Sequence, residues 1–414
     1  MTLKQDAQHK PDHVPESLYW PHSLTQFTTE QEDPFIAAAR LHDGPDIFWA
    51  KESALGKPGW VVTRHALIQE IFENTDLFSS TRDANSGATL GENTVRMIPT
   101  EVDPPEHQQY RAILNPLFSP ARVRGYAERV QATCDALIDA IPDPANCEFI
   151  GDFAEKFPNL IFLDLAGLPQ EELPQFLEWE RQLLRSGFKG DYETSQRAAG
   201  MIFKYLYGFV LAQKDNPERT EFMDLLLTGE VDGRPLDDNE VLGYLFLFYV
   251  AGLDTVYSTL GWMFRHLAAA PQLQDHLRSN PEDITKAVEE YARAYAVPAP
   301  HRRVTRDTTF HGVQLKQDDV ILLPLYLASR DPSVYDNPHV IDINRVSRPV
   351  TFARGPHICL GMYLAKREMR IALETFLRRF ESISLKPNTK YEYHTGGVLG
   401  VDKLELVLQP AGGG

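Results

Sequence analysis

The residues best able to do chemistry lie between Phe352 and Gly361, a segment that contains Cys359 and precedes a strong helical pattern. A cysteine at a helix start faces unpaired backbone N–H groups and the positive end of the helix dipole. Both lower the pKa of a thiol and favour the thiolate, the nucleophilic and metal-binding form. Gly355 and Gly361 would let a flat group approach the backbone closely. The sequence therefore predicts a reactive or metal-binding thiolate at Cys359.

An acid and a hydroxyl, Asp254 and Thr255, follow the most apolar run of the chain, which extends from Val241 to Leu253. Burying an unpaired carboxylate in such surroundings is costly, so Asp254 needs a partner. Taken alone, these residues predict that Thr255 bonds back to the preceding helical turn and that Asp254 pairs with a distant cation.

Two further sets of charged residues are spaced one helical turn apart. Glu290 and Arg293 can pair, although Glu289 is also one turn from Arg293 and competes for it. His107 and Arg111 form the second set. Such groups are usually solvated surface features that add little stability, so neither set indicates a function by itself.

Helices are expected to position these groups, because helical patterns dominate from about Pro120 onward. One buried helical face follows the i, i+3, i+4, i+7 spacing at Val288, Tyr291, Ala292 and Tyr295. The helix after Cys359 has an apolar stripe made of Met362, Ala365, Met369, Leu373, Phe376 and Phe380. Short strands are predicted at residues 311–315, 320–323 and 404–408. The predicted fold is mainly α with small β-sheets.

The 414 residues carry a formal charge of −17, which argues against nucleic-acid binding, and 43% of them are hydrophobic, enough for a large core. Length alone suggests about three domains, but no linker or internal repeat divides the chain. We expect one domain over residues 1–414, with an extended or poorly ordered segment at 1–33. Cys134 and Cys147 are expected to be small buried hydrophobes.

The first fifteen residues lack the apolar stretch of a secretory signal, and the apolar run 241–253 is shorter than the ~20 residues needed to cross a bilayer. Three cysteines cannot all pair, and a reducing setting is the default. We expect a soluble, cytoplasmic protein that binds no membrane.

The segment 352–361, with the pattern Phe-x-x-Gly-x-His-x-Cys-x-Gly, resembles the haem-binding signature of the cytochrome P450 family. The resemblance extends over about residues 34–408 and is greatest to the soluble bacterial camphor-hydroxylase-like group. It implies the cytochrome P450 fold, haem b ligated by the Cys359 thiolate, and insertion of one atom of O₂ into an unactivated C–H bond. Ala353 stands where the family usually has glycine or another small polar residue, and is expected to alter loop packing.

The same resemblance implies roles for other residues. Gly252 would make room over the haem, and Asp254 with Thr255 would supply protons as dioxygen is activated. The remaining haem contacts would come from Phe352 and from four propionate anchors: His107, Arg111, Arg302 and His357. Arg303 is an alternative to Arg302.

Three residues, Glu290, Arg293 and Arg345, would form a structural lock behind the haem. The substrate pocket is expected to be lined by Thr100, Leu247, Val250, Val297, Val398 and Leu399. This set is apolar with one hydroxyl, which favours a compact, weakly polar substrate such as a terpenoid or norisoprenoid. Each aliphatic residue could equally be part of the core.

Electrons would come from another protein, because the chain has no Gly-x-Gly-x-x-Gly fingerprint and no length left for a fused flavin domain. The resemblance implies a ferredoxin with a separate NAD(P)H-dependent reductase. A basic island for its acidic surface would consist of Arg111, Arg122, Arg124, Lys366, Arg367 and Arg370. The alternative is that these residues are ordinary solvated charges.

Two other functions remain open. A haem-binding sensor or carrier would share the Cys359 signature but would have no need of Asp254 and Thr255. A cofactor-free cysteine hydrolase would need a histidine as base, for which His357 is the nearest candidate in sequence.

Overall fold

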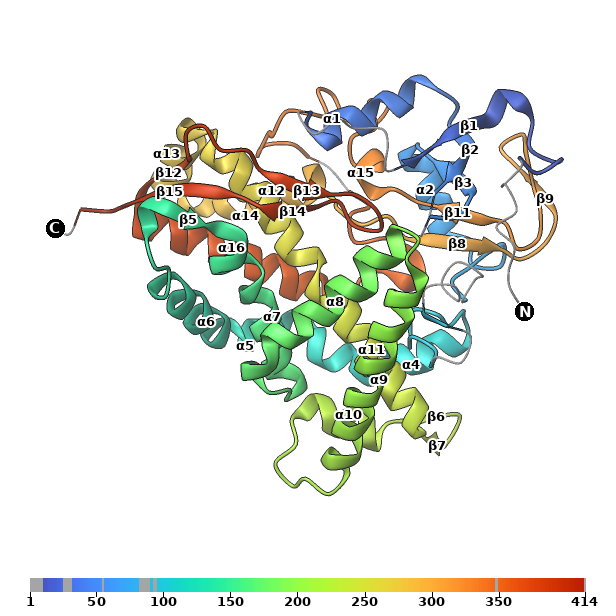
Figure 1. Cartoon of the computed structure of the whole chain (residues 1–414), viewed down its shortest axis with the longest axis horizontal. Coiled ribbons are helices and arrows are strands. Elements are labelled where there is room, and N and C mark those ends of the chain that lie inside the picture. The colour runs from blue at the N-terminus through green and yellow to red at the C-terminus, as the bar shows by residue number, and fades with distance from the viewer. Residues whose placement is uncertain are drawn as a thin grey trace.

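The computed structural model describes residues 10–24, 32–53, 56–81, 90–91, 95–346 and 349–412. Helices form most of the molecule, and the larger β-sheet lies at one end, at the upper right of Figure 1. Of the expected N-terminal segment, residues 1–9 and 25–31 lie outside the described part. Strand β1 (Tyr19–Ser23) belongs to that segment and pairs in parallel with β2 (Ile47–Glu52).

The helices form two groups. Those that accompany the sheet are α1 (Pro34–Ala39), α2 (His65–Glu73) and α15 (Leu325–Ala328). The helical body contains α4 (Glu106–Phe118), α5 (Pro120–Gly125), α6 (Ala127–Asp139), α7 (Lys156–Ala166), α8 (Leu173–Phe188), α9 (Tyr192–Lys214), α10 (Glu221–Thr228), α11 (Asp238–Leu253), α12 (Thr255–Ala268), α13 (Pro271–Ser279), α14 (Ile284–Ala294) and α16 (Met362–Arg379). In this body α8 packs on α9, α9 on α11, and α16 on α14 and α6.

Within the described residues, the larger sheet has the strand order β1-β2-β3-β11-β8-β4. Its other strands are β3 (Gly59–Val62), β4 (Phe78–Ser79), β8 (His301–Val304) and β11 (Val320–Leu322). Smaller sheets join β6 (Glu230–Val231) to β7 (Arg234–Pro235), β9 (Thr308–Phe310) to β10 (Val313–Leu315), β13 (Glu392–His394) to β14 (Gly400–Lys403), and β15 (Glu405–Pro410) to β12 (Phe380–Leu385) and β5 (Cys147–Glu148). The mainly α fold with small sheets is confirmed.

The predicted strands are found with shifted bounds: two are shorter than predicted, and the C-terminal one extends two residues further. Residues 311 and 312 form the turn between β9 and β10, because both have positive φ values, 46° and 82°. The strand predicted at 320–323 corresponds to β11, and the one predicted at 404–408 to β15.

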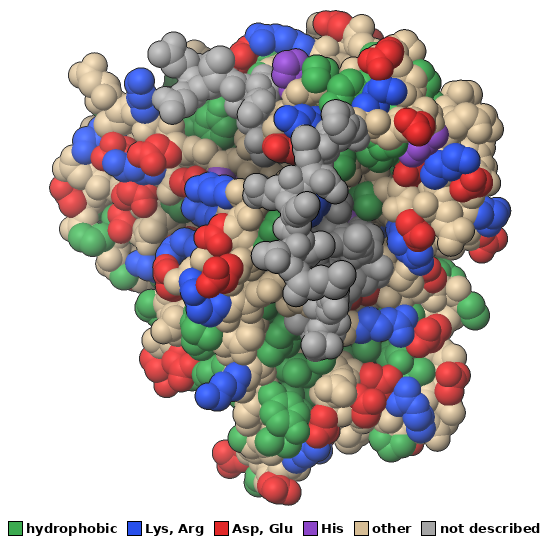
Figure 2. Space-filling view, turned by 45° about the vertical axis from the view of Figure 1, so that its right-hand side comes forward, with side chains coloured by type: hydrophobic (Ala, Val, Ile, Leu, Met, Phe, Trp, Pro, Cys, Tyr) green, Lys and Arg blue, Asp and Glu red, His purple; other side chains and the backbone are tan. Residues whose placement is uncertain are grey.

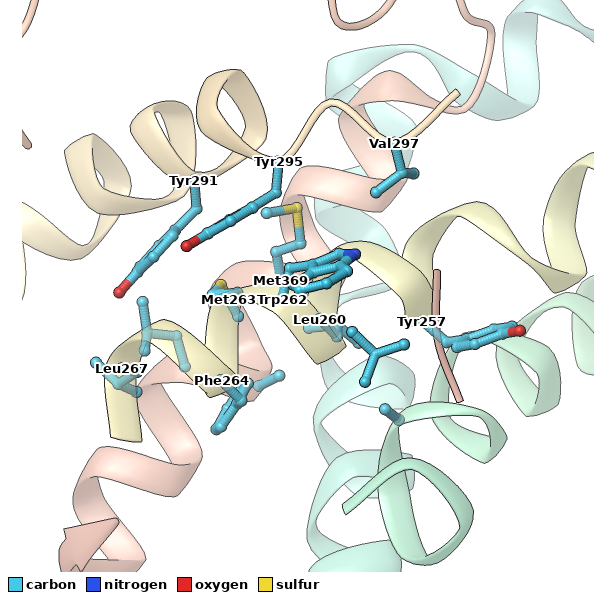
Figure 3. Close-up of a cluster of buried hydrophobic side chains, with 14 of the residues drawn as sticks. Tyr257, Leu260, Trp262, Met263, Phe264, Leu267, Tyr291, Tyr295, Val297 and Met369 are labelled. Carbon is cyan, nitrogen blue, oxygen red and sulfur yellow. The ribbon is translucent and has the colours of Figure 1, made fainter. Parts of the chain in front are cut away.

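Aromatic side chains pack α12 against α14 (Figure 3). The ring of Trp262 stacks on Tyr295, with centroids 6.2 Å apart and an interplanar angle of 17°, and Tyr291 continues the stack. The face predicted from Val288, Tyr291, Ala292 and Tyr295 is buried, which confirms the helical spacing. This packing fixes the position of α12 in the core.

The long apolar segment is not one continuous helix. Helix α11 ends at Leu253 and α12 begins at Thr255, with Asp254 between them at φ −106° and ψ −40°. By length and composition Asp238–Ala268 could cross a membrane, but 59% of its apolar window is buried inside the protein, as is common for a core helix.

Acidic and basic side chains are interleaved over the face shown in Figure 2. Ion pairs join many of the charges of the described residues, for example Arg219 with Asp224 at 2.6 Å and Lys316 with Asp307 at 2.7 Å. The face in Figure 2 therefore shows acidic side chains with basic side chains as neighbours.

Candidate active site

A cavity of about 370 Å³ lies where α4, α7, α11 and α12 meet α16 and the loop that precedes it. The predicted site residues that line it are Thr100, His107, Arg111, Leu247, Gly252, Thr255, Val297, Phe352, His357 and Cys359. The fold thus brings motifs from residue 100 to residue 359 to one cavity.

Backbone contacts hold the Cys359 loop. The Cys359 N–H donates to the Phe352 oxygen at 2.8 Å, around the short 3₁₀ helix Gly355–His357. Gly355 has φ +66°, and a Cβ there would lie 2.7 Å from the backbone oxygen of Phe72, near the end of α2. Because only glycine allows this approach, the loop packs directly on the α2 backbone.

The sulfur of Cys359 is reached from the cavity and accepts hydrogen bonds from the N–H groups of Gly361 and Met362, at the start of α16. Burial raises the pKa of the Cys359 thiol and outweighs these N–H groups and the charge of Arg111, which lower it. The net lowering predicted from the helix start is therefore wrong for the thiol in this fold. Metal ligation would have to displace its proton.

Ala353, the departure from the family pattern, has φ +60°. This left-handed region costs a residue with a Cβ about 1–2 kcal/mol. The turn is nevertheless made, since the Ala353 N–H donates to the Val350 oxygen at 2.8 Å. The loop therefore forms with alanine, but under local strain.

Four side chains that can carry positive charge gather beside the cavity: His107 and Arg111 on α4, Arg302 on β8, and His357 in the loop. The His107 and His357 rings lie 4.2 Å apart, and Arg111 donates to the Pro356 oxygen at 3.3 Å. Burial and the neighbouring positive charges lower the pKa of His107 to about 4 and that of His357 to about 2. Burial also lowers the pKa of Arg302 to about 10.

Strand β8 sends Arg302 and Arg303 to opposite faces, as alternation along a strand requires. Arg303 is directed to the outside, where it pairs with Asp318 at 2.7 Å. Arg302 is buried, and its charge acts on His357. Of the two alternatives, the structure therefore places Arg302 in the cluster.

This cluster fits the propionate groups of a haem. Both ring nitrogens of His107, Nε2 of His357 and Nε of Arg302 are buried and have no hydrogen-bond partner among the described residues. Asp103 acts on His107 and Arg302 only through its charge, which opposes the effect of burial on their pKa values. Buried donors without partners are costly, and two carboxylates would satisfy them. With the Cys359 sulfur in the same cavity wall, the residues present fit the group.

Thr255 lines the cavity, and its hydroxyl donates to the Ala251 oxygen at 3.2 Å. Asp254 is buried, with Ser258 Oγ donating to its Oδ1 at 3.1 Å and His394 Nε2 at 4.0 Å from the same oxygen. The back-bond expected from sequence alone is therefore present, and the Thr255 side chain also lies at the cavity wall.

Half of the expected substrate pocket lies elsewhere. Val250, Val398 and Leu399 are not among the described lining residues. Leu399 is in the core, where its carbonyl accepts a hydrogen bond of 2.8 Å from Trp262 Nε1. Val398 forms a bridge with Pro298 and packs on the same core, and Val250 packs on the core that surrounds α11.

The lining residues that the sequence reasoning missed include Phe118, Phe162, Leu165, Phe222, Phe248 and Thr259. Thr259 could have been found, because Leu247, Ala251, Thr255 and Thr259 follow one helical face in steps of four. Gly252 lines the cavity too, but a Cβ there would meet the Phe162 ring at 3.4 Å. This is an ordinary van der Waals distance, so Gly252 lies where α11 packs on α7.

The predicted structural lock is assembled. Arg293 donates two hydrogen bonds of 2.8 Å to the two oxygens of Glu290, and Arg345 Nε donates to Glu290 Oε1 at 3.2 Å. Glu290 and Arg293 are buried. Glu289 does not compete, since it pairs with Lys366 at 2.7 Å on the outside.

The expected basic island is largely neutralised. Three of its members form ion pairs: Lys366 with Glu289, Arg370 with Glu374 at 2.6 Å, and Arg122 with Glu221. Arg111 is half-buried in the cavity wall. Arg124 and Arg367, like Arg111, have no acidic partner among the described residues, but unlike Arg111 they do not line the cavity.

His357 is poorly suited to act as a base for Cys359. Its pKa lies far below the neutral range, and no hydrogen bond joins it to the Cys359 sulfur among the described contacts. The site therefore does not favour a cofactor-free cysteine hydrolase.

Comparison with known proteins gives a consistent result. A family model described as cytochrome P450 matches residues 168–406. The probable cytochrome P450 127A1 of Sinorhizobium fredii is 36% identical over 406 residues, which cover 96% of each chain. The linalool 8-monooxygenase of Pseudomonas putida is 27% identical over 92% of this chain and 97% of its own length. The crystal structure of CYP101J2 aligns with a TM-score of 0.86 at 27% identity, over 98% of this chain and 100% of that chain.

The matched residues include Asp254, Thr255, the Glu290 lock and Cys359, and the neighbours in structure include members of the camphor-hydroxylase-like group. The mainly α architecture, the thiol in the cavity wall and the buried cluster of His107, Arg111, Arg302 and His357 agree with these matches. This chain belongs to the cytochrome P450 family of haem-thiolate monooxygenases.

Proposed function

We propose that this chain hydroxylates a small apolar substrate of the terpenoid or norisoprenoid type, using O₂ and two electrons from a ferredoxin. The observation that carries the proposal is the cavity wall, which combines the Cys359 thiol with aromatic and aliphatic side chains and the hydroxyls of Thr100, Thr255 and Thr259. Such a wall suits a compact, weakly polar molecule. The similarity to linalool 8-monooxygenase supports a terpenoid.

Haem b would be held by Cys359 and by His107, Arg111, Arg302 and His357. When bound, it supplies the chemistry that activates O₂ for insertion of one oxygen atom into a C–H bond. The chain's own part is to fix the group, orient the substrate and manage protons. The phenylalanine rings in the wall exclude water, which strengthens the electrostatic interactions inside the cavity.

Thr255 and Asp254 would hold and supply the protons that the reaction consumes. The Thr255 hydroxyl lies at the cavity wall and can hold a proton at Oγ1, and the Asp254 carboxylate lies next to it in the chain, at the break between α11 and α12. A positioned acid beside a hydroxyl can replace each proton that the reaction consumes.

The ferredoxin, served by its own NAD(P)H-dependent reductase, would dock over Arg124 and Arg367. These two cations lie on α5 and α16, which pack together. Dependence on a diffusing electron donor suits a protein of the cytoplasm, where we place it.

Spectroscopy and turnover test the proposal. A reduced, CO-saturated sample should show the red-shifted Soret band of thiolate-ligated haem, and Cys359→Ser should abolish it. Monoterpenoids and norisoprenoids should then be titrated while the haem spin state is followed, and products analysed with a ferredoxin and its reductase. A haem sensor or carrier would show the band without product.

Thr255→Ala separates proton supply from the other steps. It should raise peroxide release and lower the product formed per NADH consumed, because protons would no longer be supplied at the step that needs them. Thr133→Ala on α6 removes the same kind of hydroxyl contact, Oγ1 to the Arg129 oxygen at 3.0 Å, outside the cavity lining; it is the matched control and should leave this ratio near that of the wild type. Unchanged coupling in Thr255→Ala would refute the assigned role.

A further inference from the structure

Asp254 is connected to the protein surface by a chain of ionisable groups from three other elements. His394 on β13 places Nε2 at 4.0 Å from Asp254 Oδ1, and its Nδ1 lies 2.9 Å from Asp402 Oδ1 on β14. Arg185 on α8 pairs with the same Asp402 oxygen at 2.7 Å. The His394 ring thus lies between a buried carboxylate and a carboxylate that is itself held by a cation.

Gly400 makes room for this arrangement. A Cβ on Gly400 would lie 2.3 Å from His394 Cε1, 2.7 Å from His394 Nε2 and 2.6 Å from Ser258 Oγ. The ring and the hydroxyl therefore share a space that only glycine leaves open at this position. Ser258 Oγ donates to Asp254 Oδ1, the same oxygen that lies 4.0 Å from His394 Nε2.

Exposure increases along the chain of groups away from Asp254. The Asp254 side chain is 7% exposed, that of His394 18%, and those of Asp402 and Arg185 23% and 29%. Solvent can therefore reach the imidazole, whereas Asp254 itself is nearly enclosed. A buried carboxylate that must be reprotonated in each turnover needs such a connection.

Other charged groups face this region and have to be separated from His394 in any test. On α8 these are Glu180 and Arg181, and on α12 it is Tyr257, whose hydroxyl accepts from Arg185 at 3.2 Å. Burial and the charge of Asp254 hold the pKa of Glu180 well above its usual value. Glu155 lies further out and pairs with Arg181 at 2.8 Å.

We propose that His394 acts through Asp254, as a positioning residue that carries protons from solvent to the buried carboxylate. The proton leaves Nε2 of the imidazolium and arrives at Oδ1 of Asp254 after a ring movement of about 1 Å, which brings the two atoms to hydrogen-bond distance. The neutral ring keeps its Nδ1–H on Asp402 and takes its next proton from solvent at Nε2. Asp402 thereby fixes the tautomer that leaves Nε2 free to exchange. The inference rests on the proposed role of Asp254.

The contact can be tested without turnover. Holoenzyme labelled with ¹⁵N-histidine, in the diamagnetic reduced and CO-bound form, should give a His394 spectrum with Nδ1 protonated and Nε2 bare in the neutral ring. Asp254→Asn should move the Nε2 resonance by several ppm and leave that of the distant His311 unchanged. Gly400→Ala, which keeps both partners but displaces the ring, should move it as well. If neither Asp254→Asn nor Gly400→Ala shifts the Nε2 resonance, the proposal is overturned.

The pH profile of coupled turnover tests the proton path. His394→Gln should slow coupled turnover about ten-fold and change the shape of its pH profile, because proton delivery through the imidazole is removed. A purely structural role would lower the rate by the same factor at every pH. His311→Gln, which removes an exposed histidine paired with Glu70, is the matched control.

Two further variants separate the possible failures. If the pH dependence survives in His394→Gln but disappears in Glu180→Gln, the proton path runs through α8 and the proposal is wrong. If Asp254→Asn slows turnover while His394→Gln does not, His394 is not the relay and the role of Asp254 stands. If Asp254→Asn has no effect, the proposed function of that carboxylate fails first.

Discussion

His107, on α4, packs its imidazole ring 4.2 Å from that of His357, which belongs to the loop before α16. Both rings are buried beside the guanidinium groups of Arg111 and Arg302, so folding keeps them neutral. A bound carboxylate would reverse this preference, because its negative charge stabilises the protonated rings. The stability of the region should therefore depend on pH in a different way with and without haem.

Removal of the haem should make the fold sensitive to mild acid. The pKa of His107 is about 4 in the folded protein against 6.5 ordinarily, so between these values the unfolded chain binds a proton that the folded chain does not. This contribution to stability is complete above pH 6.5 and is lost at about 1.4 kcal/mol per pH unit as the pH falls toward 4. Urea denaturation of haem-stripped protein at pH 7 and pH 5 measures it. His107→Gln should reduce the slope, and an unchanged slope would contradict the assignment.

Glu290→Gln should strongly destabilise the protein. The change leaves the buried guanidinium of Arg293 without its carboxylate, which costs about 3–5 kcal/mol for a buried pair. Chemical denaturation of the holoenzyme measures the loss. The neighbouring Glu289→Gln, at an exposed pair with Lys366, should change stability by less than about 1 kcal/mol. Equal losses in the two variants would show that the lock is not the stabilising element.

Ala353→Gly should stabilise the protein. Relief of the left-handed conformation outweighs the extra freedom of glycine in the unfolded chain, for a net gain of about 0.5–1 kcal/mol. Thermal unfolding of the holoenzyme measures the gain. Ala132→Gly, at an exposed position in the middle of α6, should instead lose about 1 kcal/mol. A lower melting temperature for Ala353→Gly would mean that the methyl group contributes packing that exceeds the strain.

Arg124→Glu combined with Arg367→Glu should slow ferredoxin-driven turnover several-fold, most strongly at low salt, because the steering charge is reversed. Peroxide-driven turnover needs no ferredoxin and should be unchanged. Charge reversal at Lys286, which lies on α14 and pairs with Asp283 at 2.7 Å, serves as the control. Equal slowing of both reactions would place the defect inside the active site.

Local patterns predicted those features that depend on neighbours in sequence. The spacing of Tyr291 and Tyr295 gave the buried face of α14, and the Cys359 motif gave the loop and its helix. Glu289 and Glu290 could not be separated from sequence, since each lies one turn from Arg293. Two tertiary contacts distinguish them: Arg345 donates a hydrogen bond to Glu290, and Lys366 pairs with Glu289.

The cavity wall was harder to predict, because residue type does not distinguish a cavity wall from a core. Leu399 and Val297 are both aliphatic, and only Val297 lines the cavity. The phenylalanine rings reach it from α4, α7, α10 and α11, whose relative positions depend on tertiary packing. His394 gave no signal either, since nothing in the spacing connects β13 to the start of α12.

Asp254, at the junction of α11 and α12, also affects the newly made chain before it folds. Residues Asp238–Ala268 would resemble a membrane-spanning segment to the machinery that inserts nascent chains into bilayers. Asp254 lies almost at the centre of this segment, where a carboxylate raises the free energy of insertion by about 2.5–3.5 kcal/mol. The carboxylate proposed to serve catalysis would therefore also keep a newly made chain out of the membrane.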